Sequence, residues 1–121
     1  DLDGLDVVII ENVGNLVCPA EFDTGAMRSV MILSLPEGDD KPLKYPLMFS
    51  VSDVLLVNKI DYLGFSDFDI AALRERVLTL NPRIRIFEIS AKTGQGIREW
   101  ADWLGGEVAS FVEAGARTVR A

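Results

Sequence analysis

The sequence predicts an α/β domain in which a mainly parallel sheet is flanked by helices. Four short runs are rich in β-branched and aliphatic residues, and they lie at Val7–Ile10, Val30–Leu35, Val54–Val57 and Ile84–Ile89. These runs are almost continuously apolar, which is typical of parallel strands covered on both faces. Helical patterns lie between the later runs, and alternating strands and helices favour right-handed crossovers within one sheet.

The clearest helical pattern follows the third apolar run. Asp69 can cap a helix that extends to about Leu80, and the pair Asn81-Pro82 can end it. The apolar stripe of this helix is expected to consist of Leu73, Val77 and Leu80.

A longer helix is predicted from near Gly96 to about Ala114. Its apolar face is expected to carry Trp100, Leu104, Val108 and Phe111. Trp100 and Trp103 are expected to cover the sheet rather than to bind a ligand. Residues 41–50 favour a shorter helix whose course Pro46 leaves open, and the polar tail 113–121 is expected to fray.

Composition indicates one globular unit, residues 1–121, because 49% of the residues are hydrophobic and can form a core. Twelve Lys and Arg against nineteen Asp and Glu give a net charge of −7, which argues against a nucleic-acid-binding surface. No apolar run approaches the roughly 20 residues of a membrane span. The single cysteine, Cys18, cannot form an internal disulfide, so a cytoplasmic location is the simplest expectation. The chain has no histidine, the commonest general base and metal ligand.

Polar residues follow the predicted strands, and ligands of such sheets bind at the carboxyl ends of the strands. The first group is Asn58-Lys59-Ile60-Asp61, directly after the run 54–57. An aspartate in this loop can accept hydrogen bonds from the N1–H and 2-amino groups of guanine, whereas adenine presents a mismatched edge. The loop therefore predicts guanine recognition by Asp61, with Asn58 joining neighbouring loops and the Lys59 stem covering a face of the base. The alternative is a turn with an N-capping aspartate.

The second group is Ser90-Ala91-Lys92-Thr93-Gly94, about 30 residues later and after the next predicted strand. A backbone N–H in this loop can donate to the guanine carbonyl oxygen, and Lys92 can lie over the sugar and base. Ser-Ala-Lys by itself is a weak signal. Its distance from the first motif, with one helix and one strand between them, makes the pair much more specific.

The third group is Glu11-Asn12-Val13-Gly14, after the first predicted strand. GTP-binding domains place an acid-x-x-Gly loop at this point, where the acid faces the Mg²⁺ shell and the glycine amide donates to the γ-phosphate. The usual acid is aspartate, so Glu11 is a departure from that pattern. The alternative is an ordinary strand-to-loop turn.

Two longer stretches carry a family resemblance. The segments 11–19 (ENVGNLVCP) and 37–46 (EGDDKPLKYP), together with the two guanine motifs, closely resemble the signatures of the hydrogenase nickel-incorporation GTPases, the HypB family. The resemblance covers essentially the whole chain. It implies a partial P-loop NTPase (G-domain) fold that lacks the amino-terminal P-loop unit, so residues 1–121 would be the carboxyl-terminal part of a GTPase domain.

The resemblance also implies a function, since that family couples GTP binding and hydrolysis to Ni²⁺ delivery during NiFe-hydrogenase maturation. It implies GTP or GDP and Mg²⁺ as ligands, and Cys18 as a ligand of Ni²⁺ or Zn²⁺ whose other ligands lie outside this chain. It implies that Lys44 reaches the nucleotide of a neighbouring subunit. Hydrogenase maturation factors and the hydrogenase large-subunit precursor are the implied partners, and a homodimer is allowed. Without the resemblance, Cys18 would be a small buried hydrophobe and Lys44 a solvated surface lysine.

No Gly-x-x-x-x-Gly-Lys-Ser/Thr phosphate loop occurs in the 121 residues. Because that loop supplies the amides and the lysine that hold the phosphates, this chain alone is not expected to hydrolyse GTP at a useful rate, although the intact protein would. We also expect this chain to be a fragment, or one product of a split gene. Such a chain is expected to self-associate, or to be poorly stable unless a partner supplies the missing part of the domain. Two alternatives stay open. One is a non-enzymatic module that keeps guanine and metal-loop recognition; the other is a metallochaperone GTPase of the urease type, which the stretch 11–19 disfavours.

Overall fold

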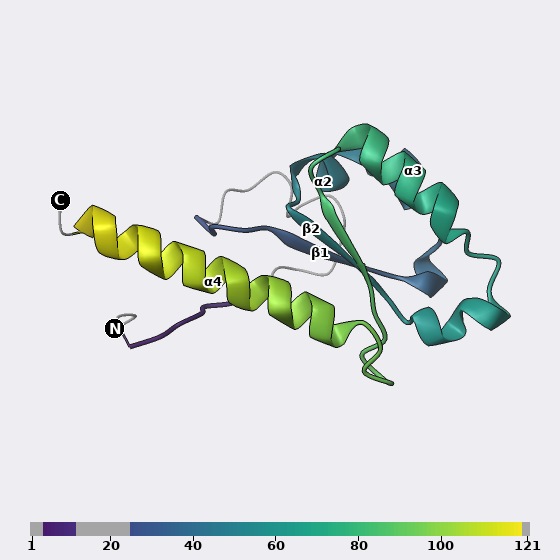
Figure 1. The fold of residues 1–121 in the computed structure, drawn as a ribbon. Helices are drawn as coiled ribbons and strands as arrows, with labels where there is room; N and C mark the ends of the chain where they lie inside the picture. The colour runs from purple at the N-terminus through teal and green to yellow at the C-terminus, as the bar shows by residue number, and fades with distance from the viewer. Residues whose placement is uncertain (1–3, 12–24, 120–121) are drawn as a thin grey trace.

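The computed structural model describes residues 4–11 and 25–119, with side chains described as far as residue 113. The elements, in which η denotes a 3-10 helix, are β1 (Val30–Ser34), η2 (Leu35–Glu37), α1 (Lys41–Lys44), α2 (Pro46–Val51), β2 (Val54–Asn58), η3 (Ile60–Phe65), α3 (Ile70–Leu80), β3 (Arg85–Glu88) and α4 (Ile97–Val119). Figure 1 shows a twisted sheet with α2 and α3 on one side and the long helix α4 on the other.

The three strands are all parallel and lie in the order β1-β2-β3. The register pairs Ser34 of β1 with Asn58 of β2, and Val57 of β2 with Glu88 of β3. Because the strands are parallel and in step, their carboxyl ends meet at one edge of the sheet. The loops that follow β1, β2 and β3 therefore start side by side, and the predicted class of a parallel sheet flanked by helices is confirmed.

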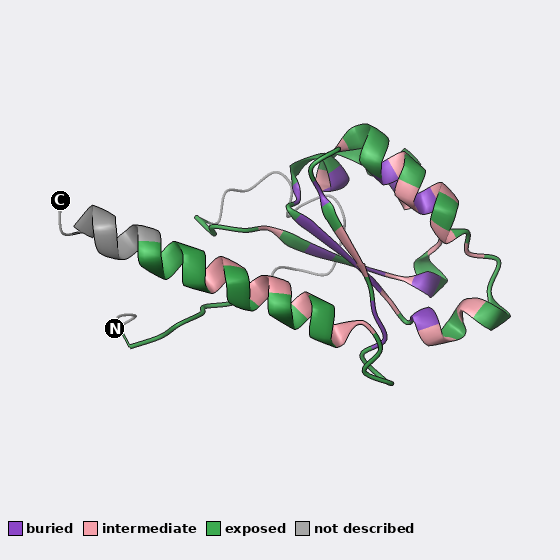
Figure 2. Ribbon diagram, in the orientation of Figure 1, coloured by how far each residue is buried: buried purple, intermediate pink, exposed green. Residues whose placement is uncertain are grey.

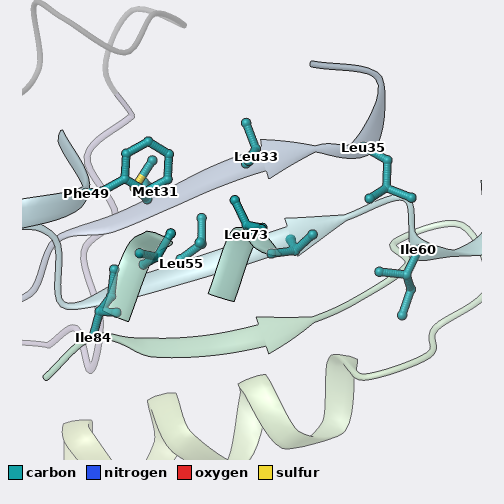
Figure 3. Packing of buried hydrophobic residues seen from close by; sticks show 10 residues of the cluster. Met31, Leu33, Leu35, Phe49, Leu55, Ile60, Leu73 and Ile84 are labelled. Atoms are coloured by element: carbon teal, nitrogen blue, oxygen red, sulfur yellow. The ribbon is translucent and has the colours of Figure 1, made fainter. Parts of the chain in front are cut away.

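The larger core lies between the sheet and helices α2 and α3. Figure 3 shows Met31 and Leu33 of β1, Leu55 of β2, Phe49 of α2 and Leu73 of α3 gathered on one side of the strands. All five side chains are buried, and each contributes roughly 1.5–3 kcal/mol of transfer free energy. The same cluster continues to Leu35 and Ile60, which stand at the carboxyl ends of the strands and hold the starts of η2 and η3 against the core.

Helix α3 begins and ends close to where the sequence predicts. The Asp69 side chain accepts a hydrogen bond from the Ala72 backbone N–H at 3.0 Å, which caps the first turn. At the other end, the Asn81 side-chain amide donates to the backbone oxygens of Phe49 and Ser52, so the chain leaves the helix tied to α2. Leu73 and Val77 are fully buried, as predicted, but the prediction that Leu80 belongs to the same apolar stripe is wrong, since this last residue of α3 is 36% exposed.

The second face of the sheet carries a smaller cluster under α4. Val54, Leu56 and Ile89 are buried there, and Phe87, Ile97, Trp100 and Trp103 pack against them. The Trp100 and Trp103 rings stack with their centroids 5.7 Å apart, and the Phe87 ring meets Trp100 edge-on at 5.9 Å. The prediction that the two tryptophans cover the sheet is confirmed.

Helix α4 extends past the sheet, as Figures 1 and 2 show. Its 23 residues measure about 35 Å, whereas a five-residue strand measures about 17 Å. Leu104 and Val108 are half-buried, but the prediction that Phe111 belongs to the covered face is wrong, since that side chain is 53% exposed. The backbone is helical as far as Val119, so α4 includes most of the tail that is expected to fray.

The predicted strand Val7–Ile10 does not form. These residues have no strand assignment, and their exposed fractions range from 42% to 82%. A strand needs a neighbour that takes its backbone hydrogen bonds, and the three strands of the described sheet pair only with one another. Only β2 is buried along both faces; on β1 the side chain of Ile32 is exposed. Apolar composition therefore identified segments that tend to be buried, without identifying what would pair with them.

Among the helices of the described ranges, none combines the length and the apolar character that crossing a membrane requires.

Candidate functional site

The first motif turns sharply away from the end of β2. Lys59 adopts a left-handed conformation, with φ 67° and ψ 33°, and it is the one described non-glycine residue with positive φ. Such a conformation costs an ordinary side chain roughly 1–2 kcal/mol, so packing or function must hold it. Here the next residue, Ile60, is buried in the core, and its N–H donates to the backbone oxygen of Ile89 at 3.2 Å. The turn fixes both Lys59 and Asp61 at the edge of the sheet.

Asn58 joins the two motif loops. Its side-chain oxygen accepts a hydrogen bond from the Ala91 backbone N–H at 3.1 Å. Asn58 ends the central strand and Ala91 follows β3, so this bond crosses between neighbouring loops. The role predicted for Asn58, tying adjacent loops together, agrees with this geometry.

Ser90 connects the second motif to the carboxylate of the first. Its side chain is fully buried, and its hydroxyl donates to Asp61 Oδ1 at 2.7 Å while accepting from the Thr93 N–H at 3.1 Å. The loop itself is closed by a bond from the Gly94 N–H to the Ser90 carbonyl oxygen at 2.8 Å. Asp61 is half-buried, and across the described residues its Oδ2 atom takes part in no hydrogen bond. Ser90 thus holds one oxygen of the carboxylate and leaves the other for a ligand.

These residues surround an open cleft of about 500 Å³. Its lining consists of Pro36, Asn58, Lys59, Asp61, Tyr62, Ala91 and Lys92. Five of the seven belong to the two predicted motifs, so residues about 30 positions apart in sequence come together at one site. Ser90 lies behind the lining, where it positions Asp61. Pro36 and Tyr62 were not predicted from sequence. The sequence holds a signal only for Tyr62, which directly follows Asp61.

The remaining predicted residues lie elsewhere. Glu11 is exposed, and Gly14 and Cys18 lie outside the described residues. Lys44 ends α1 and forms an ion pair with Asp40 at 3.1 Å, and it does not line the cleft. The hydrogen bond from Lys44 holds the pKa of Asp40 below its ordinary value of 3.8. Over residues 4–11 and 25–119, no group of three or more carboxylate, thiol or imidazole side chains is arranged to hold a metal ion.

Comparison with known proteins places this geometry in a family. The family model for the nucleotide-binding domain of CobW, HypB and UreG proteins matches residues 1–88. The chain belongs to this family, on its HypB branch. The hydrogenase maturation factor HypB of Azotobacter chroococcum mcd 1 is 50% identical over 105 residues, which are 85% of this chain and 34% of that protein.

Solved HypB structures share the fold. HypB from Archaeoglobus fulgidus matches with a TM-score of 0.73 and 39% identity, covering 76% of this chain and 50% of that one. HypB from Helicobacter pylori, solved in complex with nickel, matches with a TM-score of 0.77 and 36% identity, covering 81% and 46%. The family resemblance predicted from the motifs is confirmed. The chain spans about a third of the length of the curated relatives it matches and about half of the solved ones.

Proposed function

We propose that this chain is the guanine-nucleotide-binding part of a GTPase that couples GTP binding and hydrolysis to Ni²⁺ delivery in NiFe-hydrogenase maturation. The observation that carries the proposal is the hydrogen-bonded junction of the two loops, Ser90 to Asp61 and Ala91 to Asn58, around one cleft. Membership of the HypB branch supports the hydrogenase context, and a relative from Helicobacter pylori was solved with nickel.

The cleft suits guanine because of where its hydrogen-bonding groups lie. Ser90 already occupies Asp61 Oδ1, so the carboxylate is held in one orientation for the N1–H and 2-amino donors of the base. The Ala91 N–H donates to Asn58, which leaves the Lys92 N–H as the better donor to the guanine carbonyl oxygen. In this arrangement the aliphatic stems of Lys59 and Lys92 cover the base. Adenine would place its donor and acceptor against the wrong partners and leave Asp61 Oδ2 without a hydrogen-bond donor.

The phosphate and metal roles follow the family pattern. Glu11 offers a hard carboxylate oxygen of the kind that Mg²⁺ prefers, and the Gly14 amide would donate to the γ-phosphate. Bound Mg²⁺ would neutralise phosphate charge. Cys18 offers a thiolate, which suits Ni²⁺ or Zn²⁺, with further ligands from outside this chain. Lys44 would act across a homodimer on the partner's nucleotide, and maturation factors and the hydrogenase precursor would receive or supply the metal.

The metal part of the proposal is tested by titrating Ni²⁺ into the chain and into a Cys18→Ala variant, with thiol-reactive labelling to confirm the substitution. We expect the variant to bind Ni²⁺ roughly tenfold more weakly, because Cys18 is the only thiol that this chain can supply. Equal affinities would remove Cys18 as a ligand.

Hydrolysis is tested separately with a phosphate-release assay. The chain contains no P-loop sequence, so the amides and the lysine that position the phosphates are missing, and the Gly14 amide alone would not hold the γ-phosphate for attack by water. We expect no GTP turnover by the isolated chain, and turnover only when a P-loop-containing segment is supplied. Sustained phosphate release by the isolated chain would overturn this expectation.

A further inference from the structure

Two residues of the nucleobase cleft belong to neither motif, and they supply its apolar wall. Tyr62 follows Asp61 in η3, and Pro36 lies in η2. Both reach the cleft because η2 and η3 follow the neighbouring strands β1 and β2, whose ends are paired in register at Ser34 and Asn58. The wall is therefore built by the sheet topology and not by proximity in sequence.

The Tyr62 ring is not used by the protein core. It is 46% exposed, and the ring–ring contacts found in the described structure all lie among Phe87, Trp100 and Trp103, under α4. Exposure alone does not distinguish it, since Phe65 of the same short helix is 91% exposed. The difference is position, because Tyr62 lines the cleft and Phe65 does not.

A nucleobase presents two kinds of surface to such a cleft. Its edge carries the hydrogen-bonding groups that Asp61 and the loop amides would read, and its faces are apolar π-surfaces. Aromatic side chains stack on those faces with little dependence on which base is present. Asp61 and Tyr62 are adjacent in the chain and line the same cleft, so edge and face can be met from one turn of η3.

We propose that Tyr62, with Pro36 beside it, forms a stacking wall that raises the affinity of the cleft for purine bases without selecting among them. This inference rests on the proposed guanine site and adds a second kind of contact to it. Asp61 would decide which base binds, and the Tyr62 ring would contribute a similar factor for each base. Removing a stacked aromatic ring is expected to weaken binding roughly tenfold.

The experiment compares GDP with IDP, whose base lacks the 2-amino group, by calorimetric or NMR titration of the whole 121-residue chain. Tyr62→Ala should weaken both nucleotides roughly tenfold and keep their affinity ratio, while Tyr62→Phe, which keeps the ring, should bind as the wild type does. Asp61→Ala should instead bring the GDP-to-IDP ratio close to one. Phe65→Ala is the matched control, an aromatic truncation in the same helix but outside the cleft, and it should change neither affinity.

The outcomes separate the two proposals. If the wild type binds GDP and Tyr62→Ala binds it equally well, the stacking wall is wrong and the guanine site stands. If Tyr62→Phe loses as much affinity as Tyr62→Ala, the ring is not the contact and the wall is again wrong. If Tyr62→Ala changes the GDP-to-IDP ratio, the residue acts on the base edge and the proposed division of roles fails. If the wild type binds neither nucleotide, the guanine site itself fails. Melting curves of each variant check that folding is retained.

Discussion

The Ser90 hydroxyl provides the sharpest test of how the cleft is held together. It is fully buried and makes two hydrogen bonds, one to the Asp61 carboxylate at 2.7 Å and one from the Thr93 N–H at 3.1 Å. Ser90→Ala removes both bonds without changing the backbone or adding volume. Asp61 would then keep its charge and its place in the chain but lose the group that orients it.

The size of the effect can be worked out for stability and for binding. A hydrogen bond to a charged group contributes about 1.5–3 kcal/mol, and the lower end applies because Asp61 is only half-buried. With a smaller loss at Thr93, the variant should be about 2 kcal/mol less stable, which lowers the melting temperature by roughly 8 °C. Affinity should fall as well, because ordering a freed side chain costs about 1 kcal/mol, or roughly fivefold in Kd for GDP.

The assay pairs thermal unfolding with GDP titration, and the chain offers a matched control. The Ser50 hydroxyl donates to the Pro46 carbonyl oxygen within α2, is exposed and lies outside the cleft. Ser50→Ala should change stability by less than about 0.5 kcal/mol and leave GDP affinity unchanged. A Ser90→Ala variant that melts early but binds GDP like the wild type would show that Ser90 only stabilises the loop. That result would refute its role in orienting Asp61.

Substitutions at Asp61, Gly96 and Lys44 have expected outcomes of their own. Asp61→Asn should lose GDP affinity and gain affinity for xanthosine diphosphate. The reason is that Ser90 would hold the amide oxygen and turn the amide nitrogen toward the 2-oxo group of xanthine. Competition titration measures the base preference, and an unchanged preference would contradict this prediction. Gly96→Ala should lower stability by roughly 3 kcal/mol, because Gly96 has φ 75° and an added Cβ would collide with the Glu88 carbonyl oxygen. Gly105→Ala is the control, and it should raise stability by about 0.5–1 kcal/mol because an added Cβ there meets open space. A Gly96→Ala melting curve like that of the wild type would contradict the prediction. The hydrogen bond from Lys44 lowers the Asp40 pKa, so this pair stabilises the fold above the pKa that Asp40 has in the unfolded chain. That stabilisation is lost as the pH falls through the pKa that Asp40 has in the folded chain. In an NMR titration, Lys44→Ala should raise the Asp40 pKa more than Lys41→Ala does, and an unchanged Asp40 pKa would contradict this prediction.

Capping residues and apolar spacing predicted the helices and strands well where the groups that they contact lie within this chain. Asp69 caps α3 by accepting a hydrogen bond from the first turn of the same helix, and Leu73 and Val77 pack in the core against the sheet. The prediction for Val7–Ile10 was wrong, because pairing depends on a neighbouring strand and not on composition. Helix α4 was predicted from its apolar spacing, but the spacing carried no information on how far the sheet would reach beneath it.

In the candidate site, too, the residues within local motifs were predicted, and those brought in by distant segments were not. Asn58, Asp61 and Ser90 were predicted because each lies at or just after the end of a strand, within a motif whose residue types indicate its chemistry. Pro36 could not be predicted, because it enters the cleft only through the side-by-side arrangement of η2 and η3. The burial of Ser90 behind Asp61 likewise emerges only when β2 and β3 are placed in register.

Selection of guanine over adenine by the cleft can be measured by titrating the ¹⁵N-labelled chain first with GDP and then with ADP. GDP should cause saturable amide shifts that cluster at residues 58–62 and 90–92, the segments that surround the cleft. ADP at the same concentration should leave those amides almost unmoved, because adenine cannot satisfy Asp61. Equal shifts with both nucleotides would show that the cleft does not select guanine, and GDP-dependent shifts confined to other parts of the chain would show that the base binds elsewhere.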